Sequence, residues 1–309
     1  MGRYILKRIL TLIPVLLGVT LLVFLILSLA PGDPAKTILG EMATPEAIEQ
    51  LREEMGLNDP ILVQYGRYMG NLIRGDFGIS YKTKVGVVEE IGARFPTTMK
   101  VAFSAIIIAI VLAIPLGIVA AVKQNTLVDG LSMFIALLGV SIPIFWFSML
   151  LIQLFSVKLG WFPVQGTGTW KHYVLPGLAL GFQSMASIAR ITRSSMLEVI
   201  RQDYITTARA KGLPQGRVIR HHALPNALIP TITVTGLQIG SLLAGAVMTE
   251  TVFGLPGIGR YMVQSIEGRD TPAIMGCIIV FTVVFTLVNL IVDLLYGLVD
   301  PRIRAQYKK

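Results

Sequence analysis

The side chains of this sequence that could do chemistry are basic rather than nucleophilic, and they gather in one stretch. Residues 190–230 contain seven Lys or Arg and two acids, Glu198 and Asp203. A cluster of this kind recognises an acidic partner surface, where exposed charges steer and orient the partner more than they add affinity. Hydrophobic segments flank the stretch on both sides. The pattern predicts a docking surface beside a membrane, although basic loops also occur at membranes simply as topology determinants.

No other set of ionisable residues has catalytic or metal-binding spacing. His221 and His222 are adjacent, so they would point about 100° apart on a helix, and His172 lies in another loop. The single cysteine, Cys277, excludes an internal disulfide and a Cys-based metal cage. The sequence has no G-x-x-x-x-G-K-[ST] phosphate loop. We therefore expect no metal, cofactor or ATP site in this chain, and a membrane-embedded enzyme is disfavoured.

Composition places the chain in a membrane. The mean hydropathy is +0.69, and 15% of the residues are charged, against about 25% in typical soluble domains. Long apolar runs predict an all-α membrane domain over 1–309, with six spans at 9–30, 101–122, 130–157, 173–189, 228–248 and 273–299. The net charge of +9 lies beside these runs, which favours membrane lipid over nucleic acid as the partner of the basic residues.

The third run is too long for a straight span. Its 28 residues would measure about 42 Å as a helix, against a hydrocarbon core of about 30 Å, and Pro143 is the expected break.

The first run resembles a signal peptide, but its apolar stretch exceeds the usual 7–15 residues, so we expect it to be retained.

The loops differ in charge, and this difference predicts orientation. One side of the membrane would carry 15 bases and four acids, including both termini and the loop 190–227. That side is predicted to be cytoplasmic. The loop 31–100 is then external, and Thr44 is positioned to start a helix over 45–55 within it. This loop could cap the bundle or bind an external partner.

The basic stretch itself predicts two short helices around a glycine. Asp203 can cap a helix beginning at Tyr204, Gly212 can end it in the left-handed conformation, and a second helix from Gln215 would stop before Pro225. Such an elbow has no evident apolar core, so the rest of the protein or a partner must hold it.

The order of residues in the elbow resembles the EAA loop of binding-protein-dependent ABC importer permeases. That pattern is Glu-Ala-Ala, three residues, Gly, nine residues, Ile, one residue and Leu-Pro. Four residues match it, namely Ala208, Gly212, Leu224 and Pro225, whereas Thr206, Thr207 and His222 depart from it. The sequences TRSSMLEV and DY-I-TARAKGL are typical of one branch, the dipeptide, oligopeptide and nickel permeases.

The resemblance extends over nearly the whole chain. It includes PGDP at 31–34, GDFGIS at 75–80, RFPTT at 94–98, SIPIFWFSMLLIQ at 141–153, LQIGSLLAGAVMTETVFGLPGIGR at 237–260 and VDLLYGLVDPRIR at 292–304. It implies a type I permease fold of the first-subunit dipeptide type, in a prokaryotic cytoplasmic membrane. The implied partners are a second permease, two ATPases that bind ATP and Mg, and an external substrate-binding protein.

The resemblance also assigns candidate residues. ATPase docking would involve Asp203, Thr206, Thr207, Ala208, Arg209, Lys211, Gly212, Leu213, Leu224 and Pro225. Within this set, Ala208 and Leu213 are the candidates for buried contact with the ATPase, and the charged side chains are candidates for its rim.

Polar and small residues within the spans have two possible roles each. The amides Gln153, Gln183, Gln238 and Asn289 could line a solute pathway or join helices by hydrogen bonds. The stripe Gly236, Gly240 and Ala244 could pack helices within this chain or contact the second permease.

Three functional alternatives stay open at this point. The expected cargo is a dipeptide or oligopeptide, and the same architecture could import nickel or glutathione. A channel or ion-coupled carrier would work without ATPases, but the spans contain no mid-depth series of Asp, Glu or His for ion coupling.

Overall fold

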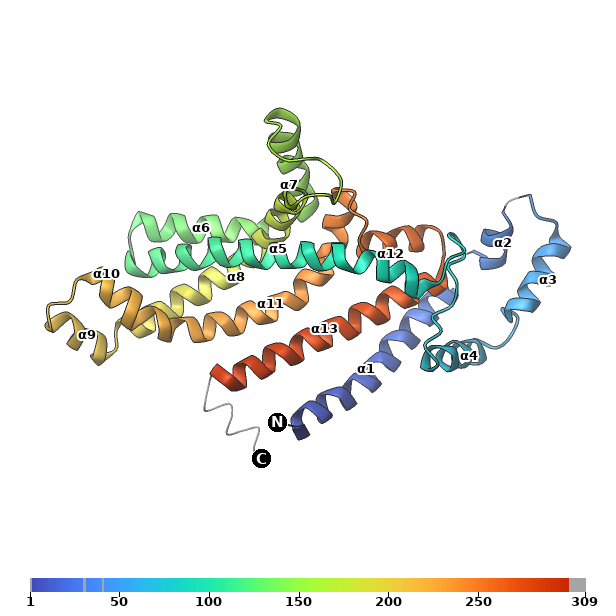
Figure 1. The fold of residues 1–309 in the computed structure, drawn as a ribbon, viewed down its shortest axis with the longest axis horizontal. Helices are drawn as coiled ribbons and strands as arrows, with labels where there is room; N and C mark the ends of the chain where they lie inside the picture. Colours follow the sequence, from blue (N-terminus) through green and yellow to red (C-terminus); the bar gives the residue numbers. More distant parts are fainter. Residues whose placement is uncertain (1, 30–31, 41, 300–309) are drawn as a thin grey trace. The chain divides into compact units, whose positions relative to one another are not determined.

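The computed structural model describes residues 2–29, 32–40 and 42–299 (Figure 1). The predicted end of the first span at Ala30 and the C-terminal bases lie outside these residues. The regular secondary structure of the described residues is helical, apart from one isolated antiparallel bridge between Ile79 and Gly86. The chain divides into two compact units. The core unit comprises Met99–Leu255 and the described residues from Leu287 to Val299; the N-terminal unit comprises the described residues of Gly2–Thr98 and Pro256–Thr286.

The all-α membrane fold expected from the sequence is confirmed. Within the described residues, five helices are long and apolar enough to span a bilayer. They are α1 (Gly2–Leu29), α5 (Val87–Val122), α8 (Val174–Ile200), α11 (Leu224–Val252) and α13 (Thr271–Val299). A bent pair makes a sixth if it is counted as one span.

That bent pair occupies the run that was too long for a straight span. It consists of α6 (Leu127–Ser141) and α7 (Ile144–Leu151), and a π-helical turn, Ile152–Lys158, continues α7. The axes bend by 107°. Pro143 stands immediately before α7 in an extended conformation. The predicted break at Pro143 is therefore present, because a proline disfavours helical conformation in the residue before it.

Two boundaries differ from the prediction around the basic stretch. The helix α8 continues to Ile200 instead of ending near Ala189, because buried Thr192 and Met196 maintain the helical repeat beyond the first arginine. The loop expected from residue 190 thus begins at Arg201. At the other end, Pro225 lies in the first turn of α11 and does not end a helix. A proline is tolerated there because the first N–H groups of a helix have no intrahelical acceptor.

The core unit is built around α8, which packs against α6, α7 and α11 (Figure 1). Leu180 and Met185 of α8 and Leu242 and Ala246 of α11 belong to the buried cluster between them. Small residues allow close approach in membranes. A Cβ atom at Gly181 of α8 would lie 2.4 Å from the carbonyl oxygen of Ala105 in α5, so only glycine fits there.

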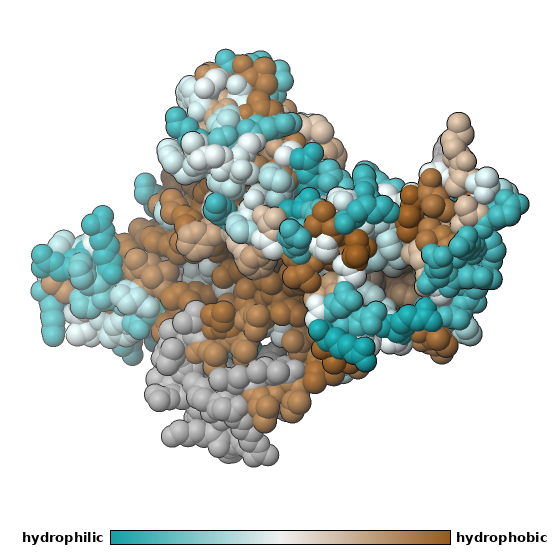
Figure 2. All heavy atoms as spheres, turned by 45° about the vertical axis from the view of Figure 1, so that its right-hand side comes forward, coloured by the Kyte–Doolittle hydropathy of each residue, from teal (hydrophilic) through white to brown (hydrophobic). Residues whose placement is uncertain are grey.

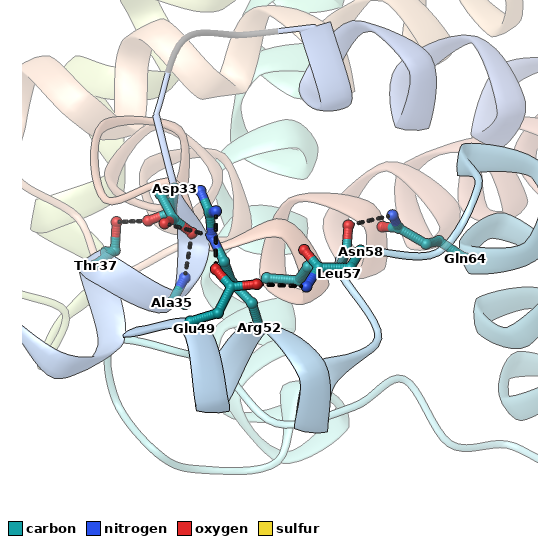
Figure 3. Close-up of polar contacts among 8 residues, drawn as sticks. All are labelled: Asp33, Ala35, Thr37, Glu49, Arg52, Leu57, Asn58 and Gln64. Carbon is teal, nitrogen blue, oxygen red and sulfur yellow. Dashed lines mark hydrogen bonds and ion pairs between the residues drawn. The ribbon is translucent and has the colours of Figure 1, made fainter. Parts of the chain in front are cut away.

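The N-terminal unit contains α1, α2 (Pro34–Leu39), α3 (Pro45–Met55), α4 (Ile61–Ile73), α12 (Ile258–Glu267) and the first part of α13. Thr44 caps α3 as predicted, accepting the Ala47 N–H at 3.3 Å. Figure 3 shows how α2 and α3 are tied together: Asp33 accepts the Ala35 N–H at 3.0 Å and the Arg52 side chain at 2.9 Å. These contacts give the segment before α4 a defined fold.

Candidate functional site

The basic stretch folds as an elbow, a term used here for residues 203–223. It consists of α9 (Asp203–Ala210), a turn at Gly212, α10 (Gln215–Arg217) and a π-helical turn, Val218–Ala223. Gly212 has φ +77°, the left-handed conformation predicted for it, and its N–H donates to the Arg209 carbonyl at 2.9 Å. The second helical segment does not stop as predicted but runs directly into α11.

The predicted cap at Asp203 is wrong. The helix α9 already includes Asp203, and the extended residue before it is Gln202, which makes no side-chain capping bond. Asp203 instead occupies the first turn, where a negative charge interacts favourably with the helix dipole.

The inner face of the elbow forms an apolar cluster with the helices it adjoins. Ile205, Ala208, Val218 and Ala223 are buried together with Ala121 of α5, Met196 of α8 and Ala227 of α11. The elbow therefore has a core, contrary to the expectation from its sequence. Since Ala208 is only 7% exposed and already packed in this chain, it is unavailable for buried contact with a partner. Leu213 and Leu224 are half-buried against the same cluster.

The outer face of the elbow carries most of the predicted docking residues. Hydrophilic side chains gather over α9 and α10 in Figure 2. The exposed members are Asp203, Thr206, Thr207, Arg209, Lys211 and Gly212, and Pro225, just beyond the elbow, is also exposed. The two threonines that depart from the family pattern are thus on the outer surface, and the Thr207 hydroxyl donates back to the Asp203 carbonyl at 3.0 Å.

A polar contact also fixes α9 against α11. The Asn226 side chain donates to the Tyr204 hydroxyl at 2.8 Å and to the His222 carbonyl at 3.3 Å. His222, the third departure from the family pattern, therefore contributes its backbone to this junction, and its side chain is half-buried.

Sequence reasoning missed an ion pair next to the elbow. Arg193 of α8 donates from Nε to Asp129 Oδ1 and from Nη2 to Asp129 Oδ2, both at 2.7 Å. Asp129 lies at the start of α6 and also accepts the Asn125 N–H at 3.1 Å. The pair joins α6 to α8, so Arg193, which the sequence groups with the docking bases, has a structural partner instead. No local pattern could reveal it, because the partners are 64 residues apart.

Two of the four predicted amides contribute to one face of the core unit. Gln238 and Gly245 lie on the same side of α11, since seven residues complete nearly two turns. A Cβ atom at Gly245 would lie 3.8 Å from Gln183 Oε1 of α8. The Ser241 hydroxyl, on the same side, donates to Gln238 Oε1 at 2.9 Å. Gln183 is exposed, so a polar surface runs along the α8–α11 junction.

The remaining predicted span residues lie elsewhere. Gln153 is exposed in the π-helical turn after α7, and Asn289 is half-buried in α13. Gly236 and Gly240 are buried within this chain, which favours the packing role for both, whereas Ala244 is exposed. The stripe is therefore not a continuous free surface.

The N-terminal unit contains a cavity of about 930 Å³. Residues of α1–α4, of the segment 76–84 and of the start of α13 line it. The segment 76–84 is held by Asp270, which is buried and accepts the Ser80 hydroxyl at 2.5 Å and the Lys82 N–H at 3.3 Å. Burial, and next the nearby Asp270 carboxylate, raise the pKa of Tyr81 to about 12.

The fold has counterparts among solved transporters. An inward-facing structure of the MetNI methionine ABC transporter aligns with 69% of this chain and 97% of its own, with a TM-score of 0.59 and 18% identity. A crystal structure of an amino acid ABC transporter with histidines aligns with a TM-score of 0.53 and 16% identity, over 68% of this chain and 94% of its own. These alignments show that the chain shares its fold with chains of those transporters.

Sequence comparison then identifies the family. Residues 113–305 match the family described as binding-protein-dependent transport system inner membrane component, and residues 1–102 match the N-terminal region of such components. The chain belongs to this family. It is a multi-pass permease subunit of a bacterial ABC importer, and the family membership implies ATPase and permease partners.

Two curated relatives cover almost the entire chain. The dipeptide transport system permease protein DppB of Alkalihalophilus pseudofirmus is 50% identical over 98% of this chain and 100% of its own length. The glutathione transport system permease protein GsiC of Escherichia coli is 45% identical over 98% of this chain and 99% of its own. The resemblance expected from the motifs is confirmed.

Proposed function

We propose that this chain is one of two homologous permeases in an ATP-driven importer of dipeptides or oligopeptides. The observation that carries the proposal is the 50% identity to a dipeptide permease over essentially the full length of both chains. Glutathione is the second candidate cargo, supported by the 45% identity to a glutathione permease. Glutathione is itself a tripeptide-like solute, so the same side chains along the pathway could accommodate either cargo.

The elbow is the proposed docking site for a cytoplasmic ATPase. Its outer face is polar and basic, its inner face is packed on three helices of this chain, and a left-handed glycine forms the turn between its helical segments. Two ATPases would each bind one permease and hold ATP with Mg between them. The charged residues Arg209 and Lys211 would orient the ATPase at the rim of the contact.

The proposed orientation puts the elbow and both termini in the cytoplasm, following the excess of Lys and Arg in those loops. The helices α2–α4 then lie outside the membrane. Their capped and ion-paired fold makes them a candidate surface for an extracytoplasmic substrate-binding protein, which would deliver the cargo.

Reconstitution into liposomes tests this function. We expect dipeptide uptake that needs ATP, this chain, the second permease, both ATPases and the binding protein together. Omitting any one component should abolish uptake. Ion-driven flux through this chain alone would contradict the proposal and support a carrier, and ATP-dependent uptake of glutathione without dipeptides would select the second cargo.

The polar α8–α11 surface is the proposed pathway lining. Replacing Gln183 and Gln238 together by leucine should reduce uptake severalfold, because the amides would no longer hydrogen-bond a passing peptide. ATP hydrolysis and the amount of assembled complex should be unchanged. The control is Gln153→Leu, an exposed amide on a separate element. If the double variant instead lowers complex assembly as much as uptake, the amides join helices rather than line a pathway.

A further inference from the structure

An open apolar groove of about 510 Å³ lies in the core unit, between α5 and the segment 167–174. Its larger lining side chains are Phe103, Ile107, Ile108, Trp170, Tyr173 and Val174. Phe103 and Trp170 are exposed by 68% and 70%. Among the described residues that line the groove, Lys100 is the one charged side chain, and its Nζ lies 5.7 Å from the centre of the Tyr173 ring. The groove thus combines apolar walls with a single cation.

Local contacts hold the second wall in place. The segment Trp170–Tyr173 is a 3₁₀ turn, and the Thr169 hydroxyl and the His172 Nδ1 atom lie 2.9 Å apart across its start. The Thr169 N–H also donates to His172 Nδ1 at 3.2 Å. Tyr173 is buried, and its hydroxyl donates to the Thr167 carbonyl at 3.4 Å. These contacts fix the shape of the second wall of the groove.

The length of α5 places the groove at a membrane interface. Val122, the end of α5, lies 22 residues after Lys100, a helical rise of about 33 Å. This matches the hydrocarbon thickness of about 30 Å. If Val122 lies at one boundary, Lys100 lies at the other, and Phe103 and Ile107 face the acyl-chain region below it. Tryptophan and tyrosine are enriched at this depth, as Trp170 and Tyr173 would be.

We propose that this groove binds one anionic phospholipid. An acyl chain would occupy the apolar walls, and the Lys100 ammonium would pair with the headgroup phosphate, because a basic residue at the membrane surface attracts anionic lipid. An anionic headgroup is favoured over a zwitterionic one because it adds no second cation next to Lys100. The proposed orientation of the chain places this lipid in the outer leaflet. The proposal that the groove binds lipid does not depend on that orientation.

A helix of the second permease is the main competing occupant. A helix is about 10 Å across with its side chains, so a volume of about 510 Å³ holds only about one turn of it. The groove also has a cation at one end and apolar walls below it, which is the polarity of a lipid and not of a membrane helix. We therefore assign the groove to lipid.

Native mass spectrometry of the full chain tests the assignment, with phosphatidylglycerol and phosphatidylethanolamine of matched chains as probes. We expect tighter binding of phosphatidylglycerol, and Lys100→Gln should weaken it about fivefold, the effect of one basic residue at an anionic lipid. Ile107→Trp, which fills the groove, should reduce the binding of both lipids. The matched control is Lys171→Gln, an exposed lysine beside the groove that does not line it.

Equal affinities for the two lipids, or an equal loss with Lys171→Gln, would overturn the proposal. A photo-crosslinking residue at position 103 in the assembled transporter provides the second readout. A lipid-sized mass increase on this chain supports the lipid, whereas a crosslink to the second permease overturns it. Neither measurement requires ATP or cargo, so a negative result leaves the proposed transport function intact.

Discussion

Replacing Gly212 by aspartate is expected to reduce transport about tenfold while the protein still inserts into the membrane in normal amount. Gly212 has φ +77°, a conformation that costs other L-residues about 1–2 kcal/mol. The turn would relax by shifting α9 relative to α10, which displaces the outer face of the elbow. A loss of about 1.4 kcal/mol in docking corresponds to about a tenfold weaker ATPase contact. The measurements are uptake in proteoliposomes and co-purification of the ATPase.

The control for this substitution lies four residues further on. Gly216→Asp adds the same charge to the elbow, but Gly216 does not have a positive φ and has open space around its Cα. We expect it to retain most of the uptake. Full uptake by the Gly212 variant would refute the role of the turn. An equal loss in both variants would attribute the effect to charge and not to backbone geometry.

Breaking the Asp129–Arg193 pair is expected to have the second large effect. Asp129→Ala would leave a guanidinium that is only 27% exposed without its carboxylate. Removing one partner of a fully buried pair costs about 3–5 kcal/mol, and the partial exposure of Arg193 reduces the expected cost to about 2–3 kcal/mol. We expect a lower melting temperature of the purified chain and reduced uptake, because α6 would no longer be fastened to α8.

A double-mutant cycle makes this test specific. The variant Asp129→Ala/Arg193→Ala should be less destabilised than the sum of the two single variants, since it leaves no unpaired charge. Arg190→Ala removes an exposed arginine one turn away on the same helix and should have little effect. Strictly additive single effects would show that the pair contributes no coupling.

The helices and turns of this protein were predictable where a local sequence feature alone determines the conformation. Apolar runs predicted the membrane helices, Pro143 predicted the bend, and Gly212 predicted a left-handed turn. The boundaries of α8 and α11 were missed because charge and proline were taken as helix breakers. In the structure, Arg190 is exposed without interrupting α8, and Pro225 lies in a first turn that tolerates it.

The predicted docking residues fall into exposed and buried groups, and this division depends on tertiary contacts that the order of residues does not reveal. Most of them are exposed on the elbow, but Ala208 turned out to be buried because Ile205 and Ala208 share one side of α9 with the apolar cluster. Arg193 was counted as a docking base because its carboxylate partner is distant in sequence. Tertiary contacts of this kind require the positions of α6 and α8 to be known.

The apolar cluster beneath the elbow has a mechanical consequence. If the elbow were joined to the helices only by flexible linkers, binding of a partner could move the elbow without moving the helices. Here Ile205 and Ala208 of α9 belong to one buried cluster with residues of α5, α8 and α11, and α8 continues as one helix back to Val174. A displacement of α9 by a partner would therefore be transmitted to α8 and along its 27 residues to the opposite end of that helix.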